Sequence, residues 1–298
     1  TEAGLDLEGL LPETIEPGTP VGVVRPEVLD VFGPDGAPTP VIAVGSHDTA
    51  SAVAAVPAVG PDFAYVSCGT WSLVGLELDA PVLTEASRAA NFTNELGVDQ
   101  TVRYLKNVMG LWVFNEAVRT WRQQGLDLDY AELDAAAGAA EPLRTVVDID
   151  DEAFFAPGDM TVRIDAAADA TGQPRPRTVG QYVRCIDDSL ALAYRRAVRR
   201  ACALAGREVS ALHMVGGGTA NALLCRAAAD ATGLPVHAGP AEATALGNIL
   251  VAARGAGLID GDLAELRRMV RASSEIVEYA PDPAAAPAWE AAERRLFG

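Results

Sequence analysis

The chain has 298 residues, of which 49% are hydrophobic, and this length allows one large core or two modest ones. Its 23 basic and 41 acidic residues give a formal net charge of −18, which argues against non-specific binding to nucleic acid or to an anionic membrane surface. No run approaches the roughly 20 apolar residues that cross a bilayer, and the N-terminus lacks the features of a signal peptide, so we expect a cytoplasmic protein.

An anionic ligand of such an acidic chain would be met by backbone N–H groups and metal ions rather than by a basic field. Lys106 is the only lysine, and a codon bias toward arginine explains this without any function. The cysteines form no C-x-x-C pair and have no zinc-like spacing with histidine. We expect them to be reduced and mostly buried: Cys68, Cys185, Cys202 and Cys225.

The first third of the chain contains one strand, turn and helix unit. Residues 1–40 are rich in Pro, Gly and acidic residues, as in a linker or a piece of something larger. The apolar run 41–44 predicts a strand buried on both faces, and Gly45 supplies the turn that follows. The Ala-rich stretch 49–56 predicts a closely packed helix. Asp48 therefore lies where a strand gives way to a helix, a usual ligand position in open α/β sheets.

The middle of the chain has fewer regular signals. Two strands around a turn at Gly69 are predicted within residues 63–77. A helix is expected from Leu111 to a stop at Gly125, because its apolar residues recur at helical spacing. Residues 125–178 are acidic and rich in proline, and we expect loops with short elements.

The last part of the chain alternates helices and strands. A long helix is expected through residues 183–201, with its end near Gly206. Beyond it we expect strands at 211–215 and 234–237, helices at 223–231 and 241–253, and a glycine turn at 216–218. The pattern as a whole predicts an α/β fold.

Asp48 is the first candidate for chemistry. A carboxylate at this turn can accept a proton from a substrate hydroxyl if it lies within hydrogen-bond reach. The alternative is an acidic residue in the first helical turn, stabilised by the helix dipole. The flanking His47 and Thr49 could hold a polyol, although each taken alone is better explained as a structural histidine and an ordinary helix-start threonine.

The turn around Gly69 and Thr70 offers donors that could cradle phosphate oxygens, and the alternative is a plain hairpin turn. Asn107, expected just before the helix near Gly110, could bond a sugar hydroxyl in both directions, or could serve as a cap or turn residue.

The glycines at 216–218 match neither a P-loop nor a Rossmann motif. They would let a flat group such as adenosine lie against bare backbone, with Asn221 as a polar contact, and a tight turn without a ligand is the alternative. Glu242 is expected to be a first-turn carboxylate without a catalytic role.

The order of these motifs carries more information than any one of them. The motifs are Ser-His-Asp-Thr-Ala-Ser-Ala at 46–52, Ser-Cys-Gly-Thr-Trp-Ser-Leu-Val-Gly at 67–75, Leu-Lys-Asn-Val-Met-Gly-Leu-Trp at 105–112, Gly-Gly-Gly-Thr-Ala-Asn at 216–221 and Ala-Gly-Pro-Ala-Glu-Ala-Thr-Ala-Leu-Gly-Asn at 238–248. With these motifs in this order, the chain resembles the rhamnulokinase group of the FGGY carbohydrate kinases from about residue 5 to residue 285. The resemblance implies the fold shared by actin, Hsp70 and hexokinase.

The resemblance also implies a reaction and its residues. The family transfers the γ-phosphate of ATP to a sugar hydroxyl, and Mg²⁺ bridges the ATP phosphates. Asp48 would be the general base, His47, Thr49 and Asn107 would contact L-rhamnulose, Thr70 would belong to the phosphate-binding hairpin and Gly217 to the adenosine site. Asn115 stands where relatives often carry a glutamine that approaches the nucleotide. The alternatives are a kinase for another ketose or polyol, such as fuculose, xylulose or glycerol, and a nucleotide-binding module without catalysis.

One large departure concerns the start of the chain. The family begins with a lobe that bears an Asp-x-Gly-Thr/Ser phosphate loop, and this element does not occur here. Residues 1–58 resemble the tail of that lobe, and residues 59–298 resemble the whole second, nucleotide-binding lobe. We therefore expect a fragment of a longer kinase, nearly inactive alone, in which the strand at 41–44 lacks its sheet neighbours.

Overall fold

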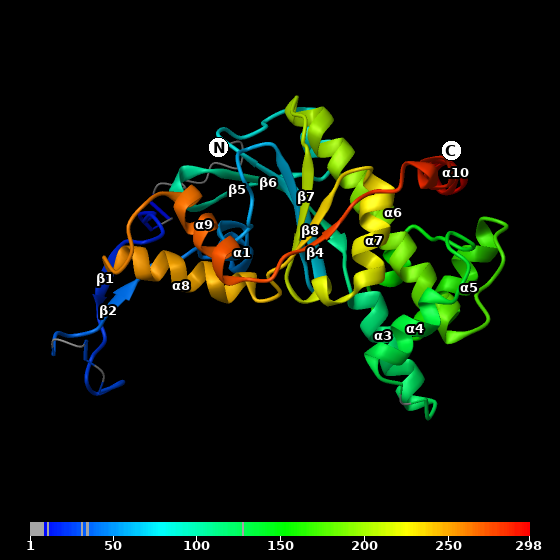
Figure 1. The fold of residues 1–298 in the computed structure, drawn as a ribbon, viewed down its shortest axis with the longest axis horizontal. Coiled ribbons are helices and arrows are strands. Elements are labelled where there is room, and N and C mark those ends of the chain that lie inside the picture. The colour runs from blue at the N-terminus through cyan, green and yellow to red at the C-terminus, as the bar shows by residue number, and fades with distance from the viewer. Residues whose placement is uncertain (1–8, 11, 31, 34–35, 127) are drawn as a thin grey trace.

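A computed structural model describes residues 9–298 apart from 11, 31, 34–35 and 127. Its centre is a seven-stranded sheet in the order β5-β6-β4-β3-β7-β8-β9, with helices packed on both faces (Figure 1). The strands of this sheet are β3 (Phe63–Cys68), β4 (Trp71–Leu78), β5 (Thr93–Leu96), β6 (Val102–Met109), β7 (Ala211–Val215), β8 (Val236–Ala238) and β9 (Val277–Tyr279). A separate two-stranded ribbon contains β1 (Pro20–Val23) and β2 (Pro40–Ile42).

Ten α-helices lie in the described part of the chain. They are α1 (Asp48–Ala54), α2 (Glu85–Ala89), α3 (Trp112–Gln123), α4 (Tyr130–Gly138), α5 (Met160–Ala170), α6 (Val179–Ala205), α7 (Ala222–Thr232), α8 (Ala243–Gly255), α9 (Leu263–Ser273) and α10 (Ala286–Phe297). Helices α1, α8 and α9 cover one face of the sheet, and α6 and α7 cover the other (Figure 1).

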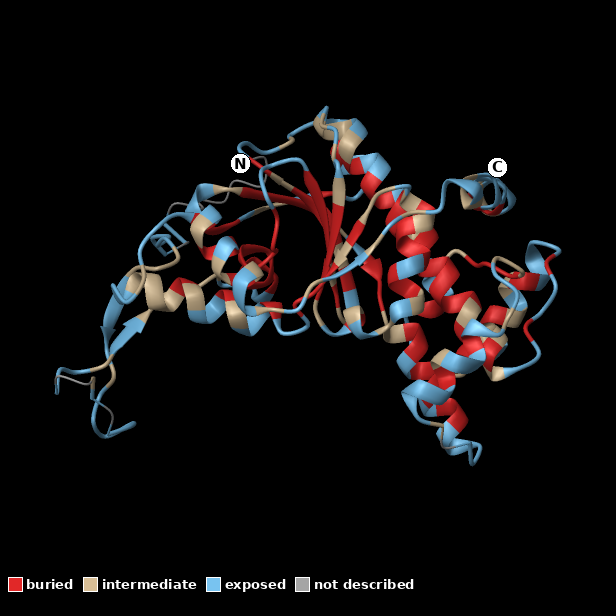
Figure 2. Ribbon diagram, viewed as in Figure 1, coloured by how far each residue is buried: buried red, intermediate tan, exposed pale blue. Residues whose placement is uncertain are grey.

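The central strand β3 shows why the sheet is covered on both faces. Ala64 and Val66 pack into the main core with α6, whereas Phe63 and Tyr65 pack toward α1 and α8. All four are at most 3% exposed, as expected for a strand between two helical layers (Figure 2). β3 runs antiparallel to β4 and parallel to β7, so its carboxyl end at Cys68 lies beside the carboxyl end of β7.

The sequence predicted several of these elements. The α/β class is confirmed, and so are the two strands around Gly69, the long helix that ends before Gly206 and the strand and helix alternation after it. Gly206 adopts a left-handed conformation, with φ of 63°, as a C-terminal glycine stop requires. The helix expected at residues 49–56 is α1, which packs against α8. That contact is close because Gly247 of α8 lies against the backbone of Ser51.

The prediction of a strand buried on both faces at residues 41–44 is wrong. β2 has three residues, and Val41 is 41% exposed. Within the described residues β2 pairs with β1 alone, in antiparallel register, and of its three residues only Ile42, which lies against Gly255 of α8, is half-buried. The strand was also expected to lack the sheet neighbours that would cover it, and Val41 is indeed exposed.

Residues 125–178, expected to form loops with short elements, contain such elements between irregular stretches. The segment forms two helices, α4 and α5, each started by an aspartate N-cap. Asp129 forms a capping box with Glu132, because each side chain bonds the backbone N–H of the other residue. Strands β5, β6 and β9 and helices α2, α9 and α10 were not predicted at all.

Candidate functional site

The predicted site residues gather at the carboxyl ends of β3 and β7. A cavity of about 620 Å³ opens there. Its lining includes six of the seven residues assigned from the sequence, and these are His47, Asp48, Thr49, Thr70, Asn107 and Gly217. Segments more than 150 residues apart in the chain are therefore brought to one cavity by the sheet topology.

Asp48 is the first residue of α1, and its side chain is 75% exposed. The hydroxyl of Thr49 donates to Asp48 Oδ1 over 3.3 Å, and His47 Nε2 lies 3.4 Å from the same oxygen. The other ring nitrogen of His47 lies 3.3 Å from Glu95 Oε2, which Arg103 holds at 2.9 Å. His47 therefore links the exposed carboxylate to the ion pair of half-buried Glu95 with buried Arg103, and limits the orientations that Asp48 can take.

Thr70 lies at the tip of the β3–β4 hairpin and is exposed to the cavity. The start of α3 fixes the hairpin through two hydrogen bonds. The N–H groups of Leu111 and Trp112 donate to the carbonyl oxygens of Gly69 and Thr70, respectively, at 3.0 Å each. Gly110 lies so close that an added Cβ would be 2.7 Å from the Gly69 carbonyl oxygen. The turn is thus rigid, and its outer surface is open.

The three glycines after β7 divide into two roles. Gly216 and Gly218 pack on Cys68, so that a side chain on either would overlap that residue. Gly216 also has a φ of 91°, which favours glycine. A Cβ on Gly217, in contrast, would meet nothing within 4 Å. Gly217 therefore presents bare backbone to open space while its neighbours fix the turn.

Beneath this turn, Cys68 belongs to a buried polar cluster. Its thiol lies 3.4 Å from the hydroxyl of Tyr194, which is 2.7 Å from the hydroxyl of Ser72. Burial raises the pKa of the Cys68 thiol, and the hydrogen bonds from Tyr194 and Ser72 only partly oppose this. Cys68 is therefore a neutral packing residue between the hairpin and the glycine turn.

A second cavity, of about 330 Å³, adjoins the first and shares Gly217 with it. Most of its wall is apolar, and Asn115 is exposed within it. The rings of Phe114 and Tyr130 stack there with centroids 5.9 Å apart. The lining residues are Leu111, Phe114, Asn115, Tyr130, Asp134, Gly217, Gly218, Ala220 and Asn221. A flat aromatic group would fit such a slot.

Asn221 was predicted as a polar contact of this region, and the structure gives it two structural bonds. Its side-chain oxygen accepts from the N–H of Leu224 and so caps α7. Its amide nitrogen donates to Asp187 Oδ1 at 3.0 Å. Asn221 lines the second cavity, but its hydrogen bonds within the protein fix its orientation.

Asn107 was expected just before a helix, but it lies within strand β6. The alternative that it is a cap or turn residue is therefore wrong. Because side chains alternate along a strand, Asn107 and Lys106 point to opposite faces of the sheet. Asn107 lines the first cavity, whereas Lys106 lines a different one. The pair Lys106-Asn107 therefore cannot act at a single site.

Two further residues of the first cavity were not assigned to it from the sequence. Glu242, at the N-cap of α8, lies in the lining, although the sequence indicated only a helix-start carboxylate. Trp71 is 46% exposed at the hairpin and packs edge-on against Phe155, with ring centroids 6.1 Å apart. The described lining contains no Lys or Arg, so an anion here would depend on backbone N–H groups.

Comparison with known proteins gives a consistent family. Residues 64–256 match the family described as the FGGY family of carbohydrate kinases, C-terminal domain. The chain is 45% identical over 276 residues to a rhamnulokinase of Bacteroides thetaiotaomicron, covering 93% of this chain and 55% of the relative. It is 36% identical over 282 residues to a rhamnulokinase of Bacillus subtilis, covering 94% of this chain and 56% of the relative. The chain thus spans about half the length of these relatives.

Solved structures show the same fold at lower identity. A ligand-bound xylulose kinase from Lactobacillus acidophilus matches with a TM-score of 0.72 and 17% identity, over 95% of this chain and 56% of that one. A glycerol kinase from Plasmodium falciparum with ADP matches with a TM-score of 0.68 and 16% identity, over 98% of this chain and 57% of that one. None of the helices in the described ranges has the length and apolar character needed to cross a membrane.

Proposed function

The chain belongs to the FGGY family of carbohydrate kinases, and from this premise we propose that a full-length protein containing it transfers the γ-phosphate of ATP to the 1-hydroxyl of L-rhamnulose. The observation that carries the proposal is the shared cavity. It brings an exposed carboxylate, a rigid glycine hairpin and a bare glycine turn to the ends of two parallel strands. The relatives named rhamnulokinase favour the sugar.

Asp48 is proposed as the general base. As the sugar oxygen forms its bond to the γ-phosphorus, the bond from that phosphorus to the ADP oxygen breaks, and the hydroxyl proton passes to the Asp48 carboxylate. The contacts with Thr49 and His47 support this role because they orient the carboxylate while leaving it 75% exposed. His47, Thr49 and Asn107 are then the proposed contacts of the other sugar hydroxyls.

The nucleotide is proposed to occupy both cavities. Thr70 and the N–H groups of its hairpin would bind phosphate oxygens, and the adenosine would lie across Gly217 into the apolar slot beside Asn115. The open space above Gly217 fits this group, because a side chain there would fill it. Asn115 is the proposed polar contact, although its amide is shorter than a glutamine's.

The fit of Mg²⁺ can also be tested against the residues. In the part of the chain that is described, no group of three His, Cys, Asp or Glu could hold a metal alone. Mg²⁺ in such enzymes needs only one or two carboxylates besides phosphates and water. With Asp48 as the base, Glu242 is the carboxylate in the cavity that would hold it. When bound, the ion neutralises charge on the phosphates.

The substrate assignment is tested by measuring ADP release by the full-length kinase with L-rhamnulose, L-fuculose, D-xylulose and glycerol. The highest kcat/KM is expected with L-rhamnulose. A clear preference for one of the other three compounds would contradict the assignment of L-rhamnulose as the substrate. It would not contradict the proposed transfer of phosphate from ATP.

The chain by itself is a second candidate, as a nucleotide-binding module without turnover. Both cavities proposed for the nucleotide are built from residues 47–244 of this chain, whereas the proposed base remains exposed to water. Calorimetry of the 298-residue chain with ATP and Mg²⁺ should detect weak binding. Turnover of L-rhamnulose above background, lost in Asp48→Asn, would contradict the module proposal.

A further inference from the structure

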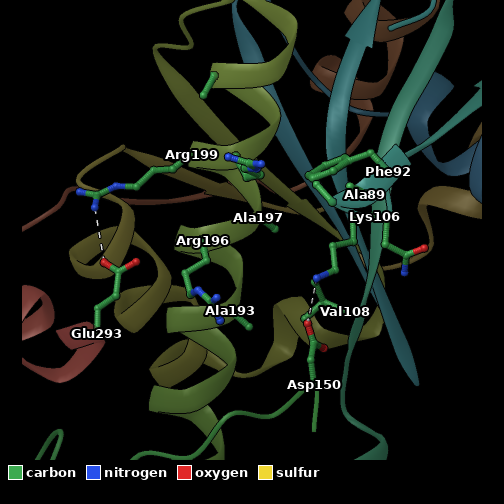
Figure 3. A pocket seen from close by; sticks show the side chains of 14 residues that line it. Ala89, Phe92, Lys106, Val108, Asp150, Ala193, Arg196, Ala197, Arg199 and Glu293 are labelled. Atoms are coloured by element: carbon green, nitrogen blue, oxygen red, sulfur yellow. Dashed lines mark hydrogen bonds and ion pairs between the residues drawn. The ribbon is translucent and has the colours of Figure 1, made fainter. Parts of the chain in front are cut away.

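A cluster of basic residues lines a third cavity of this acidic chain, of about 720 Å³, on the face of the sheet opposite the one that Asn107 faces. Four of the 23 basic residues line it, and they come from two elements: Lys106 from β6, and Arg196, Arg199 and Arg200 from α6 (Figure 3). Its acidic lining residues are Asp150 and Glu293. The lining thus has two more positive than negative charges, whereas the whole chain has a formal charge of −18.

The floor of the cavity is formed mainly by alanines, together with one aromatic ring and one valine. Ala193 and Ala197 of α6 lie opposite Ala89 and Phe92, and Val108 of β6 forms part of the wall (Figure 3). Because the arginines of α6 recur three and four residues apart, they stand on one face of the helix. They therefore surround a hollow floored by alanines, of a size typical of small-molecule sites.

The partners of these cations show which charges are available to a ligand. Arg199 lies 3.5 Å from Glu293, which Arg195 binds more closely at 2.8 Å. Lys106 lies 3.5 Å from Asp150 Oδ2, while Asp150 Oδ1 accepts a 2.8 Å bond from the N–H of Met109. Lys106 and Arg199 thus share carboxylates that are engaged elsewhere.

Arg196 and Arg200 are compensated still less. The Arg196 guanidinium lies over the ring of Phe297, 3.3 Å from its centroid. Its positive charge acts on Asp148, whose pKa is nevertheless raised because the carboxyl is desolvated. Arg200 has no hydrogen bond or ion pair to any described residue. The two guanidinium groups are therefore the cations most able to bind an added anion.

We propose that this cavity, named here the Arg200 cavity after its least compensated cation, is a second ligand site that binds a small phosphate ester. Planar guanidinium groups bind phosphate oxygens in pairs, and Lys106 adds a third positive charge from the facing strand. The phosphate-ester class follows from the two parts of the cavity: cations on one wall for the phosphate, and an alanine and Phe92 floor for an uncharged body. An extended polyanion such as nucleic acid does not fit a single hollow in so acidic a chain.

The site is separate from the one proposed for ATP. The first cavity has no Lys or Arg among its described lining residues, so the two sites bind anions by different chemistry. This proposal therefore does not depend on the proposed kinase function. One strand joins the sites, since Lys106 and Asn107 are neighbours in β6 that face opposite cavities.

The test is isothermal titration calorimetry of the 298-residue chain with inorganic phosphate, ribose 5-phosphate and ribose, at constant ionic strength. Both phosphate compounds are expected to bind, and ribose is not. The double variant Arg196→Gln/Arg200→Gln should weaken phosphate binding at least about tenfold, because it removes the two charge-assisted contacts. Arg200→Lys keeps the charge but loses the planar pair of donors, and should bind phosphate more weakly than the unaltered chain and more tightly than Arg200→Gln.

Arg177→Gln is the matched control, since it removes an exposed arginine that lines none of these cavities. It should bind phosphate like the unaltered chain. If the double variant loses its thermal melting transition, Arg200→Gln alone serves the same comparison, because this exposed side chain supports no described contact. Absence of phosphate binding by the unaltered chain, or an equal loss in Arg177→Gln, or no loss in the arginine variants, would overturn the proposal.

Discussion

Gly218 lies directly against Cys68, so that a methyl group on Gly218 would overlap the cysteine sulfur. Cys68 is 1% exposed and is held by Ser72 and Tyr194, so it cannot move aside. The glycine turn after β7 and the hairpin after β3 are therefore positioned by one buried contact. The spacing between the proposed phosphate and adenosine sites depends on it.

Gly218→Ala should therefore destabilise the protein by about 1–3 kcal/mol, as overpacking of a rigid core does. Gly217→Ala is the matched variant one residue away, where an added Cβ has no neighbour within 4 Å. It should keep the stability of the unaltered chain and weaken ATP binding. Denaturant unfolding and calorimetry measure the two effects, and similar stabilities for both variants would contradict the packing argument.

Asp48→Asn should lower kcat of the full-length kinase by about 10²–10⁴-fold, because the amide cannot accept the hydroxyl proton. The KM for ATP should change little, since the carboxylate is proposed to act on the sugar. Asp62→Asn is a suitable control, as Asp62 is an exposed carboxylate near Arg207 and outside both cavities. A kcat within a few-fold of the unaltered kinase would exclude Asp48 as the base.

Local sequence was sufficient for two of the turns that carry the site, those at Asp48 and at Gly69. A turn at the end of a strand is specified by a few adjacent residues, so both turns were predicted at their observed positions. The opposite holds for β6. Its alternation is obscured by Arg103, which is 2% exposed because it pairs with Glu95 of β5. A buried charged residue looks like a surface residue until its partner is known.

Tertiary context also explains the two other failures. The apolar run at 41–44 has the composition of a buried strand, but burial depends on neighbours that no local pattern specifies. Glu242 and Lys106 could not be assigned to their cavities because the sheet, not the adjacent sequence, decides which face each side chain reaches. The roles assigned to the seven site residues stay predictions, and so does the boundary between residues 58 and 59. The seven residues are His47, Asp48, Thr49, Thr70, Asn107, Asn115 and Gly217.

The four free cysteines should differ in reactivity. Burial raises the pKa of each thiol, to about 12 for Cys185 and for Cys225. Cys202 is the one that is not fully buried. Because alkylation requires an accessible thiolate, iodoacetamide at mildly alkaline pH should label Cys202 first. Peptide mass spectrometry gives the order, and equal labelling in denaturant is the control. Faster labelling of Cys68 than of Cys202 in the folded chain would show that the hairpin opens.

A buried carboxyl pair on α6 gives the stability a definite pH dependence. Asp187 is 0% exposed, its Oδ2 has no hydrogen-bond partner among the described residues, and Asp188 is its neighbour. Burial raises the pKa of Asp187 to about 8, and Asp188 adds to the rise while the bond from Asn221 opposes it. The folded state therefore holds a proton that the unfolded chain, with a pKa near 3.8, releases.

The sign of the pH dependence follows from this difference. Between about pH 4 and 8 the folded state binds more protons, so this contribution to the free energy of unfolding is complete at low pH and is lost as the pH rises. Asp187→Asn, a neutral replacement, should have a flatter stability profile and be more stable than the unaltered chain near pH 8. Urea unfolding between pH 4 and 8 measures the free energy of unfolding of each variant. Asp79→Asn is the control, because Asp79 is exposed. A profile for Asp187→Asn parallel to that of the unaltered chain would mean that Asp187 is ionised in the folded protein.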